Sequence, residues 1–425
     1  MNTVKPPLLR PALPTTKWRA GLLMVVFGQG VVSGTNFLTG VLIARSLGIE
    51  EFGVFTLFWL VVIFLQGLQK ALVTTPLLSF VAKNSAEAQP LYIRRAFTLQ
   101  VFLLLIIWAI LLLIMGFGPV ALLADYRNIF PPLIISLLFI QFHDFLRRQF
   151  FAQHKPKLAL RIDVIRNGTQ IFLVLAAPLY FDAVSISTFI YCIGVSAAIG
   201  LLSGAAHLPK KIVPLAEIPA FLPAHFRFSK WLVGSVLLEW ISGSIYFIFA
   251  GILLGPAAVG AMKAAQNLGG IAQLLFQAAE NFLVPNIARV FKNHGDRAAR
   301  RLAKQAALGS FLVTGILALL LGIPGEFWIQ TLFGPSYAGF GYAVGMFSLT
   351  YLVFSVFVPL RSYFIAKAQP KVLMAGFMAS AVFSVIASYP LIVWFGLFGA
   401  ILGIGLSFAM LLSVVYINFT TQDNT

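Results

Sequence analysis

The sequence predicts an all-α integral membrane protein of about 12 transmembrane helices, arranged as two parallel six-helix bundles around a central cavity. Three observations predict this fold. Hydrophobic residues make up 60% of the 425 residues, only 10% are charged and the mean hydropathy is +0.93, whereas soluble domains carry about a quarter charged residues. Apolar segments of about 20 residues, each long enough to cross a bilayer, recur along the chain. Basic residues gather in alternate connections, as cytoplasmic loops do.

The apolar segments fall into two sets of six. The first set is expected near 20–43, 53–82, 97–118, 129–150, 160–181 and 185–207. The second is expected near 229–253, 258–287, 305–324, 340–364, 372–394 and 397–418. The first segment is too long for a signal-peptide core and is interpreted as a retained helix. The second and the eighth exceed one crossing, which predicts a tilted, bent or extended helix at each place.

A proline-rich stretch separates the two sets. Four prolines and three basic residues lie between 208 and 228. Proline at this density is expected to break a continuous helix, and the basic residues suit a connection at the cytoplasmic surface. The predicted organisation is therefore an N-terminal bundle over 1–208, a cytoplasmic linker over 209–228 and a C-terminal bundle over 229–425.

The two halves share short motifs at nearly constant spacing. Five residues after the fourth segment, beginning with Arg147, recur 214 residues later, beginning with Arg361. Leu47, Gly48 and Gly53 recur 207 residues later in the corresponding first connection of the second half. These matches indicate a duplication. Because six crossings return the chain to its starting side, the halves must be parallel, an arrangement that in transporters places the substrate site between the repeats.

The formal charge of +17 follows the predicted topology. Of the 30 Lys and Arg, 26 fall on one side, Arg45 and Arg127 fall on the other, and Lys70 and Lys263 lie inside segments. This asymmetry marks the basic side as cytoplasmic, with both chain ends there. The basic balance is thereby explained without a nucleic-acid partner.

Polar side chains within the apolar segments are the main functional signal, because a charge at a helix centre costs about 2.5 to 3.5 kcal/mol and usually faces a partner or a wet cavity. Helical spacing places one polar stripe on the eighth segment and part of another on the second. The candidate substrate-binding residues are Lys70, Lys263, Gln29, Asn36, Gln66, Gln266, Gln273 and Gln277. Glu239 and Glu280 are candidates for ion coupling, and Arg161, Asp163 and Arg166 for the cytoplasmic part of the cavity wall.

Structural interpretations of the same residues stay open. Glutamines in membrane helices often only hydrogen-bond a neighbouring helix. Lys263 and Glu239 could form a buried pair that holds the halves together, and Arg161 and Arg166 could extend to the cytoplasmic surface. No metal-ligand spacing, cofactor motif or enzyme signature is present, and the single cysteine, Cys192, excludes a disulfide framework.

Residues 43–55, which read IARSLGIEEFGVF, are similar to the first connection of bacterial polysaccharide flippases. These proteins belong to the multidrug, oligosaccharidyl-lipid and polysaccharide exporter superfamily. The Ala-x-x-x-Pro-Lys turns at 152–157 and 366–371 and the twelve-helix plan extend the resemblance over nearly the whole chain. A peptidoglycan-precursor branch of the superfamily has fourteen helices, for which this chain lacks room.

The resemblance implies a flippase that moves an undecaprenyl-diphosphate-linked oligosaccharide across the bacterial inner membrane by alternating access. Lys70 and Lys263 would attract the diphosphate, amide side chains would bind sugar hydroxyls, and a proton or sodium ion would couple through Glu239 or Glu280. A polysaccharide polymerase and glycosyltransferases are the implied protein partners. Two alternatives stay open: a drug exporter of the same superfamily, which would have a more acidic cavity, and a non-transporting membrane scaffold for glycan assembly.

Overall fold

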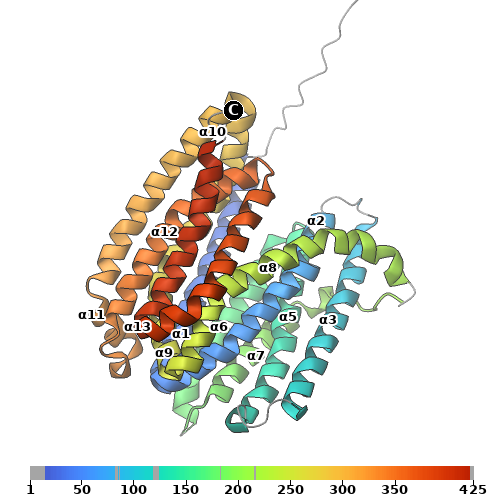
Figure 1. The fold of residues 1–425 in the computed structure, drawn as a ribbon. Helices are drawn as coiled ribbons and strands as arrows, with labels where there is room; N and C mark the ends of the chain where they lie inside the picture. The colour runs from blue at the N-terminus through green and yellow to red at the C-terminus, as the bar shows by residue number, and fades with distance from the viewer. Residues whose placement is uncertain are drawn as a thin grey trace, which may run out of the picture.

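The computed structural model describes residues 15–81, 85, 87–117, 124–181, 183–214 and 217–421. Of the predicted site residues, Gln29 is described for its backbone only. Helices and short turns make up these parts of the chain, and Figure 1 shows the helices running roughly side by side.

The first half contains five long helices and several short ones. They are α1 (Thr15–Gln69), the π-helix η1 (Lys70–Thr74), α2 (Thr75–Val81), α3 (Gln89–Phe117), the 3-10 turn η2 (Ala124–Ile129), α5 (Phe130–Ala152), α6 (Pro156–Tyr180), α7 (Ile186–Leu202) and the turn η3 (Ala205–His207). Gly48 interrupts α1 with φ 77° and ψ 177°, a conformation that glycine adopts without steric cost.

The second half follows the same pattern with longer continuous helices. They are α8 (Ile218–Leu254), α9 (Pro256–Gly269), α10 (Ile271–Gly322), α11 (Gly325–Phe333), the turn η5 (Pro335–Tyr337), α12 (Gly341–Ala366) and α13 (Pro370–Thr421). Gly295 interrupts α10 and Gly396 interrupts α13, both with positive φ.

Eight helices in the described ranges are long and apolar enough to cross a membrane. Three of these spans, Gly30–Val81, Ile271–Gly322 and Pro370–Thr421, have 52 residues each. A helix of that length rises about 78 Å, which is far more than the hydrocarbon thickness of about 30 Å. The protein is therefore an all-helical membrane protein, and a turning glycine lies inside each of its three longest spans.

The backbone repeats its unusual conformations at the two spacings found in the sequence. Gly48 and Gly255, which are 207 residues apart, have φ of 77° and 88°. His154 and Ala368, which are 214 residues apart, have φ of 56° and 54° and are the two non-glycine residues with positive φ among those described. Each belongs to the turn that precedes a Pro-Lys pair. The repeated motifs therefore fold alike.

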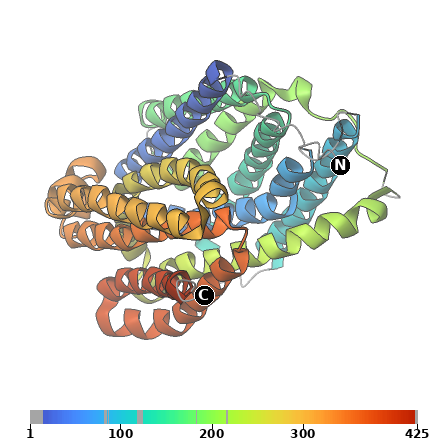
Figure 2. The same ribbon diagram turned by 90° about the horizontal axis from the view of Figure 1, so that it is seen from above.

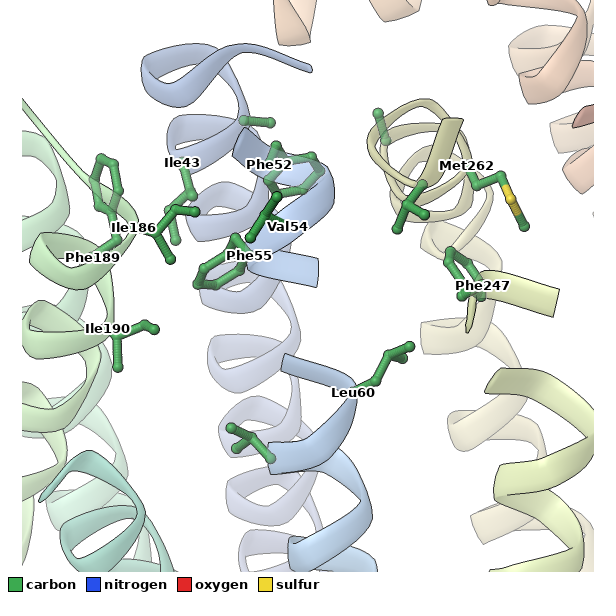
Figure 3. Close-up of a cluster of buried hydrophobic side chains, with 14 of the residues drawn as sticks. Ile43, Phe52, Val54, Phe55, Leu60, Ile186, Phe189, Ile190, Phe247 and Met262 are labelled. Carbon is green, nitrogen blue, oxygen red and sulfur yellow. The ribbon is translucent and has the colours of Figure 1, made fainter. Parts of the chain in front are cut away.

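Helices of each half pack mainly with one another. Helices α10, α12 and α13 pack together, as do α5, α6 and α7 (Figures 1 and 2). The halves meet where α1 packs against α9. Figure 3 shows the apolar core beside this contact, with Phe52 and Phe55 of α1 between Phe189 of α7 and Met262 of α9.

The proline-rich stretch is more helical than expected. Helix α8 begins at Ile218 and continues through Pro223, so the expectation that these prolines break the helix is wrong for its second part. Pro219 occupies the first turn, where a proline leaves no hydrogen bond unmade. Pro223 removes only the bond to the carbonyl of Pro219, close to the helix start.

Candidate functional site

A cavity of about 610 Å³ lies between helices of both halves. Its wall comes from α1, η1, α5, α6, α7, α9 and α10. A second cavity of about 410 Å³ adjoins it and shares Asn36, Lys263, Asn267 and Gln273 with it. We call the two adjoining cavities together the chamber.

The chamber wall is cationic. Five of its side chains are basic and two are acidic; these are Lys70, Arg147, Arg148, Arg166, Lys263, Asp144 and Asp163. The Arg147 Nε donates to Asp163 Oδ2 at 2.6 Å, and the Arg148 Nε lies 3.5 Å from Asp144 Oδ1. These pairs leave an excess of positive charge facing the space.

Lys263 brings a cation from the second half. It lies on α9, half-buried, and its Nζ donates to Gln266 Oε1 at 2.8 Å, one turn further along the helix. Among the described residues no ion pair joins it to Glu239, so the buried pair considered for these two residues is not formed. A desolvated ammonium without a carboxylate favours the approach of an anion.

Lys70 brings a cation from the first half, and a local distortion of the helix positions it. It is the first residue of the π-helix η1 and is exposed to the chamber. The preceding residue, Gln69, is buried and donates from Nε2 to the carbonyl of Gln141 on α5 at 2.7 Å. π-Helical turns inside α-helices frequently occur at functional sites, where the inserted residue redirects side chains.

Helix α6 forms a hydrogen-bonded side of the chamber. The Asn167 Nδ2 donates to the carbonyl of Asp163 at 2.7 Å, and the Gln170 Nε2 donates to Thr39 Oγ1 of α1 at 2.9 Å. Arg166 Nη1 lies 3.1 Å from Nδ1 of the buried His143. Because a guanidinium only donates, Nδ1 accepts, which leaves the proton on Nε2, 3.4 Å from the carbonyl of Ile162.

Most of the predicted site residues line the chamber. These are Asn36, Gln66, Lys70, Asp163, Arg166, Lys263, Gln266, Gln273 and Gln277. Three do not. Arg161 is exposed on α6, Glu239 is exposed on α8, and Glu280 lies 3.6 Å from the guanidinium of Arg361 between α10 and α12. The side chain of Gln29 lies outside the described part.

Several chamber residues were missed at the sequence level. Arg147 and Arg148 stand at the end of the fourth segment, where basic residues usually mark the cytoplasmic boundary. Asp144, three and four residues before them, was the available signal, because an acid at that helical spacing indicates pairing. Asn267 and Tyr351 also line the space.

The end of the chamber near Gly48 is closed by contacts between the halves. Phe52 and Phe55 are buried at this end. Beyond them, the Arg45 Nη1 donates to the carbonyl of Thr331 at 2.9 Å, and the Tyr337 hydroxyl lies 3.5 Å from the carbonyl of Ala44. These contacts bring α11 and η5 of the second half over the first connection of the first half.

The arginines lie toward the opposite end. Phe130, the first residue of α5, contacts Phe58 with ring centroids 5.8 Å apart, so α5 starts near the closed end. Arg147 follows 17 residues later, about 25 Å along the helix. No group of three or more histidine, cysteine or acidic residues in the described ranges is placed to hold a metal ion.

The fold is shared with transporters of the MOP superfamily. A multidrug resistance MATE family transporter of that superfamily in an inward-facing conformation matches with a TM-score of 0.74 and 15% identity, covering 91% of this chain and 93% of that one. The lipid II flippase MurJ, in an inward closed conformation, matches with a TM-score of 0.70 and 13% identity, covering 94% and 87%. A Pyrococcus furiosus MOP transporter, described as having a binding pocket of reversed polarity, matches with a TM-score of 0.61 and 15% identity, covering 95% and 94%.

At these identities the likeness concerns the fold. No curated protein is significantly similar to the chain in sequence. The proteins that share this fold are described as a multidrug resistance transporter and a lipid II flippase. A family model described as polysaccharide biosynthesis protein matches residues 19–291, well over half of the sequence. The chain belongs to the polysaccharide biosynthesis protein family.

Proposed function

We propose that this protein is a flippase that moves an undecaprenyl-diphosphate-linked oligosaccharide across the bacterial inner membrane. The observation that carries the proposal is a cationic, amide-rich chamber that receives Lys70 from one half and Lys263 from the other. The family and the MurJ-like fold support it. Glycosyltransferases would supply the lipid-linked glycan, and a polysaccharide polymerase would extend the flipped product.

The proposed topology has twelve crossings in two parallel bundles, 1–208 and 229–425, joined by a cytoplasmic linker over 209–228. Turns at Gly48, Gly295 and Gly396 divide the three 52-residue spans into two crossings each. The continuous chain from α9 into α10 supplies one crossing before Gly295, and α7, a shorter apolar helix, supplies the twelfth crossing. Both chain ends then lie in the cytoplasm, and Arg45 lies on the outer side.

The chamber offers separate chemistry for the two parts of such a substrate. Among the described residues, the wall cations Lys70, Lys263 and Arg166 form no ion pair with a carboxylate. Arg166 donates to His143, whereas the two lysines come from opposite halves, so they suit a diphosphate. The amides of Gln66, Gln266 and Gln273 both donate and accept, as sugar hydroxyls do. The diphosphate would thus contact both halves through the two lysines. The sugar hydroxyls would replace hydrogen bonds to water with hydrogen bonds to the amide side chains.

Alternating access requires one end of the chamber to open as the other closes. The outer end is closed by Arg45 and Tyr337, and the arginine pairs lie toward the cytoplasmic end. This arrangement fits a state that loads substrate from the cytoplasm, and the likeness to an inward-facing transporter supports it. Breaking the outer contacts would release the substrate to the other side.

For ion coupling we propose Glu280 and Glu239, which lie outside the chamber wall. Glu280 pairs with Arg361, an arginine that corresponds to Arg147 of the first half. A proton or sodium ion arriving at Glu280 would compete with this pair. Coupling would then act on the packing of α10 against α12 rather than directly on the substrate.

A reconstituted assay tests the proposed function. Proteoliposomes carrying a fluorescent undecaprenyl-diphosphate sugar are expected to lose its outward movement when Lys70→Ala and Lys263→Ala are combined. The control combines Arg289→Ala and Lys292→Ala, two exposed cations on α10 away from the chamber. Absence of movement by the unsubstituted protein, or equal movement by both double variants, contradicts the proposal.

A drug exporter is the second candidate, because a multidrug transporter shares the fold with a TM-score of 0.74. The excess of cations on the chamber wall counts against it, since organic cations would be repelled. Uptake of a fluorescent organic cation into the same proteoliposomes discriminates the two. The chamber also counts against a non-transporting scaffold for glycan assembly, because a scaffold does not need an internal polar cavity.

A further inference from the structure

The chain that connects the two halves carries exposed basic and aromatic side chains along its length. We call this set the linker surface, and its members are Lys210, Lys211, Phe226, Arg227, Lys230 and Trp231. Phe226 is 56% exposed and Trp231 is 59% exposed. The Nζ of Lys230 lies 5.4 Å from the centre of the Trp231 ring, so the ammonium and the aromatic ring lie side by side.

The length of α8 places this surface at the edge of the membrane. The helix has 37 residues and rises about 55 Å, which exceeds the hydrocarbon thickness of about 30 Å. The excess of about 25 Å must extend past the apolar layer. Arg227 and Lys230 assign this excess to the start of α8, because charges are disfavoured inside the layer. Tryptophan and lysine are the residues that anchor helices at the level of lipid headgroups. In Figure 1 this part of α8 lies at the same end of the molecule as α2.

The positive charge of the linker surface is not neutralised by the protein. Among the described residues, none of its four cations forms an ion pair, and the neighbouring acid, Glu217, lies 3.9 Å from Arg95 instead. Exposed aromatic rings beside unpaired cations match a phospholipid, whose anionic headgroup and acyl chains lie side by side.

A buried histidine joins the linker surface to the chamber. His225 precedes Phe226 and is 3% exposed. Its Nε2 lies 2.6 Å from the carbonyl of Leu72, and its Nδ1 lies 3.0 Å from the Tyr92 hydroxyl. Because a carbonyl only accepts, Nε2 donates to Leu72 and Nδ1 accepts from Tyr92. Leu72 lies in η1, the π-helix whose first residue is Lys70.

We propose that the linker surface binds the headgroups of anionic phospholipids, and that this binding, acting through His225, fixes η1 and therefore the position of Lys70 in the chamber. The proposal goes beyond transport of a glycan and does not require it. A lipid bound at the linker surface restrains the start of α8, and the two hydrogen bonds of His225 transmit that restraint to the π-helix.

Lipid retention tests the binding step without any transport substrate. Purified protein is analysed by native mass spectrometry after exchange into mixed micelles with phosphatidylglycerol or phosphatidylcholine. The linker variant replaces four cations with Gln: Lys210, Lys211, Arg227 and Lys230. It is expected to retain less phosphatidylglycerol, by about five-fold for each cation removed, and to retain as much phosphatidylcholine as the unsubstituted protein. The matched control places Gln at four other exposed cations, Arg289, Lys292, Arg297 and Arg301.

The two variants distinguish a site from general attraction. A large loss in the linker variant and a small loss in the control support the proposal. Equal losses in both variants overturn it, because they show that any cluster of cations retains the lipid. Equal thermal unfolding midpoints in detergent establish that both variants are folded.

Chemical labelling tests the transmission step. Lys70→Cys is placed in a Cys192→Ala background, and its reaction with a water-soluble maleimide is followed in vesicles of phosphatidylcholine with or without phosphatidylglycerol. The labelling rate is expected to differ between the two vesicles and to become equal once the four linker cations are Gln. His225→Phe is expected to abolish the difference while phosphatidylglycerol is still retained. A lipid-independent rate in the unsubstituted linker, or an unchanged difference in His225→Phe, overturns the transmission step.

Discussion

Gly53 and Gly260 meet the opposite half of the molecule in the same way. A Cβ atom on Gly53 would collide with the carbonyl of Pro256, and one on Gly260 would collide with the carbonyl of Ile49. Both pairs are related by the 207-residue spacing, so each half uses the same glycine against the same partner position of the other. At this reciprocal contact the backbones of the two halves approach so closely that only glycine permits it.

Replacing either glycine is expected to push α1 and α9 apart. Overpacking a tight contact typically costs about 1 to 3 kcal/mol, and here the obstacle is backbone that has little room to move. Gly53→Ala and Gly260→Ala should each lower the thermal unfolding midpoint. Gly30→Ala is the control, because nothing lies near its Cβ. A thermal unfolding midpoint unchanged by Gly53→Ala would show that the close contact between the halves does not contribute to stability.

Removing one partner of the Arg147–Asp163 pair should destabilise the first half. The pair is 2.6 Å long, and the Asp163 side chain is 4% exposed, so Asp163→Asn leaves an uncompensated buried charge, which typically costs about 3 to 5 kcal/mol. Denaturant unfolding in detergent measures this loss. Combining Asp163→Leu with Arg147→Met should recover much of it, and a double variant less stable than Asp163→Asn would contradict this explanation.

Glu326 should make the stability of the segment formed by α11 and η5 sensitive to acid. The amide of Gly339, the side chain of Gln330 and the amide of Gly341 donate to its carboxylate, and these hydrogen bonds lower the pKa of Glu326 despite some desolvation. A group with a lowered folded-state pKa contributes stability above its unfolded pKa of about 4.3, and loses it as pH falls through the folded value. The protection factor of the Gly339 amide against hydrogen exchange should therefore fall as pH drops below about 4.3. In Glu326→Gln this protection factor should be low and should no longer change with pH.

Weakening the outer closure should favour the state that is open outward. Arg45→Ala removes the bond to Thr331, and Tyr337→Phe removes the contact with Ala44. A population shift is expected because the closed state loses contacts that the open state does not make. Spin labels on the first connection and α11 should report longer distances. Arg127→Ala, an exposed arginine at the same end, is the control and should leave the distances unchanged.

The membrane fold was predictable because lipid imposes simple rules on sequence. Apolar segments must be helical and of limited length, and the repeated motifs at 207 and 214 residues already indicated two similar halves. The polar stripe with Lys263 predicted a shared chamber, because charge inside a membrane is rarely tolerated elsewhere. Lys263, Gln266, Gln273 and Gln277 of that stripe line the chamber.

Other features depend on contacts between distant residues and could not be read locally. The π-helix at Lys70 requires packing of α8 and the bond from Gln69 to Gln141, neither of which has a sequence signature. The spacing from Asp144 indicated that Arg148 is paired, but only the packing of α5 shows that Arg148 lines the chamber. Glu280 lies on the same helix as the chamber glutamines but points to Arg361, because its helix continues beyond the chamber.

The change of spacing from 207 to 214 residues shows that the duplicated halves have diverged in one place. Only 13 positions separate Phe117 from Phe130, whereas 19 separate Gly322 from Gly341. The longer segment of the second half contains α11 and η5, which reach across to Arg45 and Ala44. Two identical halves would make the same contacts in both directions. This segment contacts the first half, and no equivalent segment of the first half among the described residues contacts the second, so the two halves are structurally asymmetric.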